Sequence, residues 1–232
     1  NVVNNSPYKE KICMRNFIMA AFAVLSLTFS SMVSAAPNLD VSVFSRHVWR
    51  GGSAGDVVSI QPSLTVPFDS TGTSLNIWGQ VPINGGATEY DFTVAQEVGD
   101  YATVILTSYY YPSDTSPLLD VDSHDIEVGV GSTFGDATVY VGRVVSSTSV
   151  EGDTYAEVGY PFAGFGLSVG VGDGAYTDSG DFGVVSVGLS YTPAKPERGD
   201  RGAARNWLKG YGASFIYNPD SETPYFVVSK TW

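Results

Sequence analysis

Apolar and polar residues alternate along most of the chain. The clearest stretch is 58–68, in which every second residue is apolar or Pro and the residues between are mainly Ser, Gln and Thr. A period of two predicts strands with one apolar and one polar face. Similar stretches occupy residues 41–49, 75–83, 89–98, 101–111, 125–133, 137–145, 156–162, 165–171, 185–191, 211–217 and 226–232. We therefore expect about twelve strands of roughly 9–11 residues, a length that crosses a bilayer when the strand is tilted.

The connections between these strands alternate in length. Tight turns are predicted at Gly99-Asp100, Gly135-Asp136 and Ala163-Gly164, with longer polar segments between them. Short turns at one end and long loops at the other are typical of outer-membrane barrels, with the short turns in the periplasm. Alternation alone would also fit a soluble sandwich or a lipocalin-like barrel. The loop lengths favour an all-β fold, an antiparallel transmembrane β-barrel.

Aromatic residues near the strand ends support the membrane barrel over the soluble folds. They are Trp49, Tyr101, Tyr109, Tyr110, Tyr111, Tyr160 and Phe162. Aromatic girdles are expected where barrel strands meet the membrane interface. The last alternating strand ends on Trp232, which resembles the C-terminal signal of outer-membrane proteins, although Lys230 stands where an apolar residue is usual. We expect the assembly machinery of the outer membrane to bind this strand.

The N-terminus has a different pattern. Lys9, Lys11 and Arg15 precede an apolar run at 17–27, and small residues follow. This order describes a secretory signal peptide, and the run is shorter than the roughly 20 residues of a transmembrane helix. A retained anchor is the less favoured alternative. The predicted organisation is an upstream or non-native extension at 1–13, a signal peptide at 14–36 that is cleaved after Ala35 or Ala36, and a barrel domain at 37–232.

Removal of the signal peptide makes the remaining chain more acidic and free of cysteine. The whole chain has 12 Lys and Arg, 24 Asp and Glu and one Cys. Cys13 lies before the predicted signal peptide, and the predicted barrel domain keeps 9 cationic against 23 anionic side chains. This balance excludes a basic surface for nucleic acid. It is compatible with solubility, with a cation-attracting lumen or with acidic loops that bind divalent ions.

One segment concentrates the positive charge. Residues 193–209 hold five of the nine remaining cations, together with Pro and Gly, where a short periplasmic turn is expected. A solvated periplasmic loop is the favoured interpretation. A contact with peptidoglycan or with anionic lipid headgroups is the alternative.

Several short motifs are spread along the predicted barrel domain. The opening run at 45–68 has an aromatic residue, Arg50 and Gly51 before a polar loop and a strand with Gln61-Pro62, and the runs SYYYPSD at 108–114, AEVGYPF at 156–162 and FVVSKTW at the end follow. Together these motifs resemble the TorF family, a proteobacterial family described as porins. The family's opening step has one more residue before the Arg, and its Pro precedes its Gln. The resemblance implies an outer-membrane barrel, suggests a porin and supplies no catalytic residues.

If the apolar faces point to lipid, the opposite parity lines the lumen. The pore-lining candidates are Arg46 and Arg50 on the first strand, Glu89, Asp91 and Glu97 on the fourth, Asp125 and Glu127 on the sixth, and Glu157 on the eighth. Cations facing carboxylates across a channel would orient solutes and favour small cations. Alternatively, these charges pair and fill a narrow barrel without conduction. Arg143 has ambiguous parity.

Other chemical signals are weak. His47 and His124 fall on the apolar parity near the outer rim, which predicts interfacial histidines. A Gly-x-Ser-x-Gly elbow is missing and no serine can be paired with either histidine from the sequence, so we expect no enzyme. Asp120, Asp122 and Asp125 lack the Gly and Glu of an EF-hand loop, which favours a solvated acidic loop over a metal site. No cofactor is expected.

These observations predict an outer-membrane porin-like channel for the passive diffusion of small hydrophilic solutes or ions. The alternative is a closed structural or surface-interaction barrel without channel activity. In both cases the partners are membrane lipid and the assembly machinery, and in the first case also small solutes.

Overall fold

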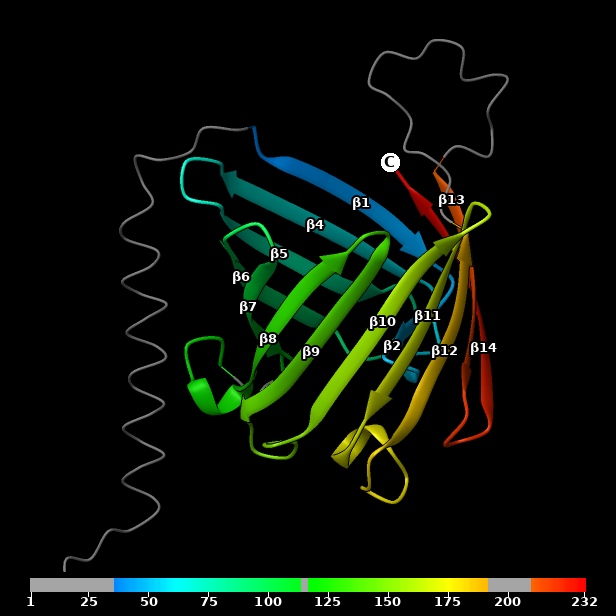
Figure 1. Ribbon diagram of the computed structural model, residues 1–232. Coiled ribbons are helices and arrows are strands. Elements are labelled where there is room, and N and C mark those ends of the chain that lie inside the picture. Colours follow the sequence, from blue (N-terminus) through cyan, green and yellow to red (C-terminus); the bar gives the residue numbers. More distant parts are fainter. Residues whose placement is uncertain (1–35, 114–116, 192–209) are drawn as a thin grey trace, which may run out of the picture.

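The computed structural model describes residues 36–113, 117–191 and 210–232. Within these ranges, twelve antiparallel strands form one closed barrel, which confirms the predicted fold class (Figure 1). The barrel strands are β1 (Asn38–Phe44), β4 (Ser59–Phe68), β5 (Thr73–Pro82), β6 (Glu89–Val98), β7 (Ala102–Tyr110), β8 (His124–Phe134), β9 (Ala137–Ser146), β10 (Thr154–Phe162), β11 (Phe165–Gly172), β12 (Gly183–Tyr191), β13 (Tyr211–Asn218) and β14 (Thr223–Thr231). Consecutive barrel strands pair with each other, and β14 pairs with β1. Almost all of the predicted signal peptide and the whole basic segment 193–209 lie outside the described residues.

The side chains divide between two faces as the alternation predicts. Leu64, Ile77 and Val130 point outward and remain 37%, 49% and 46% exposed. The opposite face is polar, and there Asn76 donates a hydrogen bond of 2.9 Å to Ser63 on the neighbouring strand. A soluble barrel buries its apolar face inside, whereas a barrel in a membrane turns that face to the lipid. The arrangement fits an outer-membrane barrel.

The predicted tight turns are present at one end of the barrel. Phe162 pairs with Phe165, which leaves Ala163 and Gly164 as a two-residue turn. Their φ angles are 52° and 85°, as in a type I′ turn, whose twist matches that of the flanking strands. Most of the connections at the other end of the barrel are longer, and they include the two 3₁₀ helices, η1 (Val121–Ser123) and η2 (Gly174–Tyr176). No helix in the described ranges is long and apolar enough to cross a membrane.

The start of the barrel differs from the prediction. The first barrel strand ends at Phe44 instead of continuing to Trp49. Beyond Phe44 the backbone ladder to β14 continues only in part: the Ser45 N–H still donates to the Val228 carbonyl at 2.9 Å, but the Val228 N–H donates to the Ser45 hydroxyl at 3.0 Å. The chain then forms a separate hairpin of β2 (His47–Trp49) and β3 (Gly52–Gly55). This lumen hairpin lies within the barrel (Figure 1).

The buried core lies inside the barrel, around the lumen hairpin. The side chains of Tyr109, Tyr155, Val185 and Glu127 are 7%, 3%, 0% and 1% exposed, and they come from strands on different sides of the lumen. In a barrel whose outer face is apolar, the interior is where polar groups must find partners, because water is excluded wherever side chains fill it. Buried polar groups of the lumen such as Glu127 therefore lie around the hairpin.

Candidate functional site

The tip of the lumen hairpin is a two-residue turn formed by Arg50 and Gly51. Their φ angles of 49° and 80° match a type I′ turn. A Cβ atom on Gly51 would lie 1.8 Å from the backbone oxygen of Val185 on β12. The side-chain amide of Asn218, at the end of β13, donates a hydrogen bond of 3.1 Å to the Gly51 carbonyl. The tip is therefore seated directly against the far wall of the barrel.

The Arg50 side chain forms a two-pronged ion pair with Glu127 on β8. Nη1 lies 2.5 Å from Oε2 and Nη2 lies 2.6 Å from Oε1. The two side chains are 9% and 1% exposed. Paired donors and acceptors of this kind combine charge with a fixed geometry. Because an unpaired buried charge is costly, each partner depends on the other to remain in the lumen.

Tyrosine hydroxyls complete the hydrogen bonds of this ion pair. Tyr176 in η2 accepts a hydrogen bond of 2.6 Å from Nη1 of Arg50. Tyr109 on β7 and Tyr140 on β9 donate to Oε1 of Glu127, the first at 3.2 Å. The carboxylate therefore has partners from the hairpin and from two strands, which locks the ion pair in one arrangement.

Four aromatic rings surround the Arg50 guanidinium. Its Cζ atom lies 4.2 Å from the ring centre of Trp49, 4.6 Å from Tyr155, 5.4 Å from Tyr140 and 5.6 Å from Tyr176. Rings at these distances attract a cation through their negative faces. Burial by itself would lower the pKa of Arg50, but the hydrogen bond and charge of Glu127 outweigh it, so that the pKa is raised. Burial also raises the pKa of Tyr176 to about 12, so its hydroxyl remains neutral.

A second set of contacts fixes the base of the hairpin through His47. Its ring lies 5.2 Å from the ring of Trp78 on β5, and Nδ1 is 3.5 Å from the side-chain nitrogen of Gln61 on β4. Nε2 is 3.7 Å from Oε2 of Glu89 on β6, and the other carboxylate oxygen of Glu89, Oε1, accepts a hydrogen bond of 2.8 Å from Tyr111. Burial lowers the pKa of His47 to about 4. At neutral pH the ring is therefore uncharged, and its contact with Glu89 is not an ion pair.

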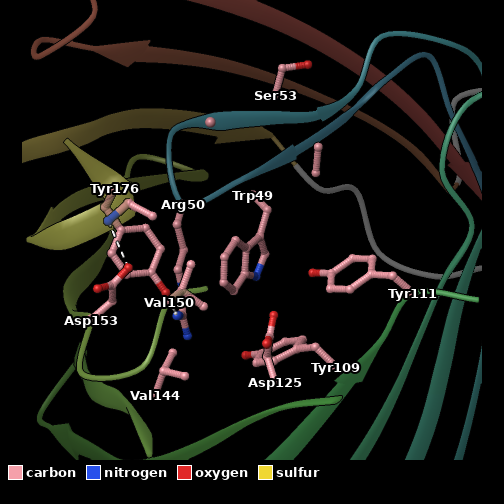
Figure 2. A pocket seen from close by; sticks show the side chains of 13 residues that line it. Trp49, Arg50, Ser53, Tyr109, Tyr111, Asp125, Val144, Val150, Asp153 and Tyr176 are labelled. Atoms are coloured by element: carbon pink, nitrogen blue, oxygen red, sulfur yellow. Dashed lines mark hydrogen bonds between the residues drawn. The ribbon is translucent and has the colours of Figure 1, made fainter. Parts of the chain in front are cut away.

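A small cavity lies between the hairpin and the long connections at 147–153 and 173–182 (Figure 2). We call it the vestibule. Its volume is about 230 Å³, and its lining includes Trp49, Arg50, Tyr109, Tyr111, Asp125 and Tyr176. The wall is stabilised by Asp153, whose carboxylate accepts a hydrogen bond of 2.8 Å from the backbone of Ala175. Aromatic faces, the Arg50 guanidinium and the carboxylates of Asp125 and Asp153 line this cavity, which suits a small polar solute.

The other half of the lumen is wider and polar. A cavity of about 570 Å³ opens beside the turn at 99–101 and is lined by groups such as Glu97, Thr103, Thr133 and Thr138. Small and hydroxylated side chains occupy the inward positions there. The lumen hairpin therefore separates a wide polar half from the vestibule.

The structure places all six predicted lumen carboxylates on inward strand positions. They are Glu89, Asp91 and Glu97 on β6, Asp125 and Glu127 on β8, and Glu157 on β10. Glu127 contacts Arg50 directly. Glu157 accepts a hydrogen bond of 2.8 Å from Tyr155, whose ring faces Arg50. Glu97 lies at the opposite end, beside the wide cavity.

The prediction was wrong about the two arginines, which are not on the first barrel strand. Arg46 lies between β1 and β2 and pairs with Asp56 at 2.9 Å, outside the buried cluster. Arg50 is at the hairpin tip. The cause is the early end of β1, because the hairpin continues the apolar–polar alternation and so resembles an extension of the strand.

Four residues assigned to the membrane interface lie on the lumen side instead. His47 and Trp49 belong to the hairpin, Tyr109 points inward beside Glu127, and Tyr111 lines the vestibule and donates a hydrogen bond to Glu89. Tyr109 shares its strand parity with Thr103 and Thr107, which marks the inward face, whereas the two hairpin residues continue the alternation of the first strand and offered no such signal. Arg143, whose side was ambiguous, has outward parity on β9 and donates a hydrogen bond of 3.0 Å to Thr154.

The aspartates of the acidic segment at 120–125 have different roles. Asp120 caps η1 by accepting a hydrogen bond of 3.2 Å from the backbone of Asp122, whereas Asp125 points into the vestibule. Among the described residues, no group of three or more His, Cys, Asp or Glu side chains could hold a metal ion.

Comparisons with known proteins found no matching family model, no matching curated protein and no matching solved structure.

Proposed function

We propose that this chain is an exported outer-membrane β-barrel whose lumen is closed by the β2–β3 hairpin, so that it does not act as an open diffusion pore. The observation that carries the proposal is the ion pair of Arg50 and Glu127, with N–O distances of 2.5 and 2.6 Å. An open pore lined by opposite charges keeps them apart across water. Here the charges meet, and the hairpin that brings them together occupies the lumen.

The hairpin is held from several sides, which argues for a plug and against a loose loop. Its tip contacts β12 through Gly51 and β8 through Arg50, while its base contacts β6 through His47. The charges of Arg50 and Glu127, and the Asn218 amide that bonds to the Gly51 carbonyl, would lose their partners if the hairpin moved away. A barrel closed in this way presents the vestibule and the long connections to the outside, as a structural or surface-interaction protein does.

The outer-membrane location rests on the apolar outer surface and on the signal-like N-terminus. Lipid is then the partner of the whole outer surface. The C-terminal strand is the proposed contact for the assembly machinery. Trp232 follows this strand and is 63% exposed, and its backbone N–H bonds to Val41 on β1 at 3.0 Å. The Lys230 ammonium lies 4.3 Å from the ring centre of Tyr211, so this unusual residue sits on an aromatic surface.

A gated porin-like channel is the second candidate. The observation in its favour is the wide polar cavity of about 570 Å³ at the short-turn end, which a purely structural barrel does not need. In this version the hairpin is a gate that leaves the lumen under voltage or on binding a solute in the vestibule. The TorF resemblance also favours a channel.

Single-channel conductance of the folded chain in a planar bilayer tests the proposal. We compare the wild type with a variant in which residues 47–55 are replaced by two glycines. The matched control removes Gly85 and Gly86 from another connection at the same end, where a Cβ on Gly85 would meet nothing within 4 Å. The closed barrel predicts a silent wild type, a silent control and steady conductance steps from the hairpin variant.

Other outcomes separate the two candidates. Steps from the wild type that appear only above a threshold voltage, with the same size as those of the hairpin variant, would support the gated channel. Steady wild-type steps at low voltage would overturn the closed barrel and indicate an open porin.

A further inference from the structure

The outer surface of the barrel carries a serine–histidine pair that the sequence could not reveal. Ser108 lies on β7 and His124 is the first residue of β8. The hydroxyl oxygen of Ser108 is 2.7 Å from Nδ1 of His124. Both residues have outward parity, because Ser108 pairs with the outward Ile126 and His124 pairs with Tyr110, on the same face. The pair is therefore outside the lumen and independent of the plug.

A backbone carbonyl fixes the tautomer of His124. Nε2 lies 2.8 Å from the carbonyl oxygen of Leu118, which can only accept a hydrogen bond. In the neutral ring the proton is consequently on Nε2, and Nδ1 presents its lone pair to the Ser108 hydroxyl. The ring is also held by stacking on Tyr110, with centres 4.9 Å apart and planes at 22°. A serine, a basic nitrogen that can take its proton and a third group that orients the base are the parts of an activated nucleophile.

The surroundings of the pair are apolar. The connection at 117–123 folds back over the outer surface and forms a cavity of about 270 Å³ with Phe92, Leu118, Leu119 and Ile126 in its lining, together with Ser108 and His124. Ser108 is 6% exposed, whereas Leu119 is 90% exposed at the rim. Pockets for drug-sized molecules have volumes of roughly 300–1,000 Å³, so this cavity suits one acyl chain rather than a bulky solute.

The position on the barrel points to the kind of substrate. The pair lies at the long-loop end of β7 and β8, on the outward face, where Val104, Val128 and Val130 of the same two strands are 41%, 40% and 46% exposed. In a membrane this level is the interface, where the ester groups of lipids lie between the headgroups and the acyl chains. An apolar cavity beside the serine would receive the acyl chain, and the ester would lie at the hydroxyl.

We propose that Ser108 and His124 are a hydrolytic dyad for acyl esters of membrane amphiphiles. Ser108 Oγ attacks the ester carbonyl carbon while its proton passes to Nδ1 of His124. The ester C–O bond then breaks, and the leaving alcohol takes the proton from His124. Water attacks the acyl-serine in the same way, again with His124 as base, and releases a carboxylic acid and free Ser108.

The test uses the full chain folded in detergent micelles and a fluorophosphonate probe with an alkyl chain. The probe forms an O–P bond with an activated serine and loses fluoride. Mass spectrometry of the digested protein locates the adduct. The proposal predicts an adduct on Ser108, and hydrolysis of a medium-chain acyl ester above the micelle background. Ser108→Ala should abolish both signals, and His124→Gln should reduce the labelling rate by roughly 100-fold or more.

Ser132 supplies the matched control. It has outward parity on β8, and its hydroxyl donates to the backbone carbonyl of Tyr101 instead of a histidine. Ser132→Ala should leave labelling and hydrolysis unchanged. All variants are first compared by circular dichroism and by resistance to unfolding in SDS, so that loss of fold is recognised. A folded wild type without an adduct on Ser108, or hydrolysis that persists in Ser108→Ala, would overturn the proposed dyad. The pair would then have only a structural role, in which His124 holds the 117–123 connection through the Leu118 carbonyl.

Discussion

Arg50 and Glu127, 77 positions apart in the sequence, form a two-pronged ion pair in the middle of the barrel. Arg50 belongs to the hairpin that enters the lumen, and Glu127 belongs to the barrel wall. A buried pair of this kind contributes little net stability compared with apolar residues of the same size, but breaking it is expensive. Its effect is to favour one position of the hairpin over all others.

Replacement of Glu127 by Gln should destabilise the protein by about 3–5 kcal/mol, because it leaves the Arg50 charge buried without a counter-ion. The free energy of unfolding is measured by denaturant titration in micelles. Glu97→Gln is the matched control, since Glu97 points into the wide cavity at the other end and lies far from Arg50. The control should change stability by less than about 1 kcal/mol.

A double-mutant cycle with Arg50→Met separates the ion pair from general disturbance. If the two side chains act as a unit, the double variant Arg50→Met/Glu127→Gln loses less unfolding free energy than the two single variants lose together. The difference should be at least about 1 kcal/mol. Additive effects would show that the hairpin is held by other contacts and that the pair is not its main attachment.

Much of the barrel could be predicted from the sequence because apolar and polar residues alternate along its strands. Alternation at 58–68 and the turn at Ala163-Gly164 are local properties, and the structure confirms both. The inward carboxylates such as Glu127 followed from the same parity, since a charge on the lipid face is costly. Local pattern and global fold agree over most of the chain.

The hairpin and the serine–histidine pair could not be predicted, because both depend on contacts between distant residues. The alternation of 41–49 does not stop at Ser45, so the sequence gives no sign that the chain leaves the barrel wall there. Likewise, Ser108 and His124 meet only through the register of β7 and β8, which a long connection separates. Register is set by pairing of the whole sheet and is not visible in either strand alone.

Gly51→Ala should displace the lumen hairpin. The new Cβ would lie 1.8 Å from the backbone oxygen of Val185, and the φ angle of 80° is also unfavourable for Ala. A displaced hairpin exposes Arg50, which is 9% exposed in the side chain when seated. Trypsin cleavage after Arg50, followed by mass spectrometry of the intact micellar protein, measures the displacement. The wild type should resist cleavage there.

Gly99→Ala is the control for backbone strain without a clash. Gly99 has a φ of 61° in a tight turn at the other end of the barrel, and a Cβ there would meet nothing within 4 Å. It should cost about 1 kcal/mol and leave Arg50 protected. Equal protection of Arg50 in Gly51→Ala and in the wild type would contradict the seating of the hairpin tip against β12.

His47 should make the protein less stable in acid. Its pKa in the folded chain is about 4, compared with an ordinary value of 6.5. Above pH 6.5 the ring is neutral in both states and pH has no effect through it. As the pH falls from 6.5 towards 4, the unfolded chain binds a proton that the folded chain does not, so the free energy of unfolding decreases, by at most about 3 kcal/mol. Gln61, Trp78 and Glu89 face the ring, and the carboxylate reduces the effect when it is charged.

His47→Gln isolates this contribution, because glutamine is polar, similar in length and does not titrate. The unfolding free energies of the wild type and the variant are compared at about pH 7 and about pH 4.5. The wild type should lose more stability between the two conditions than the variant does. An equal loss in both proteins would mean that His47 takes up a proton in the fold without penalty.

The seam between β1 and β14 should be the first part of the barrel to open. The register joins three positions there, Ser42 to Thr231, Val43 to Lys230 and Phe44 to Ser229, and single backbone hydrogen bonds at Val41 and Ser45 extend it, whereas seven positions join β1 to β4. The early end of β1 at Phe44 shortens the seam, and a hydrogen bond of 2.7 Å between the hydroxyls of Ser42 and Thr231 spans it from inside. Fewer ladder hydrogen bonds mean a smaller free energy of local opening.

In hydrogen exchange measured by NMR in micelles, the amides of β14 that point to β1 should exchange faster than those that point to β13. Thr231→Val should increase this difference, and equal protection on both sides of β14 would show that the barrel closes as firmly at the seam as elsewhere.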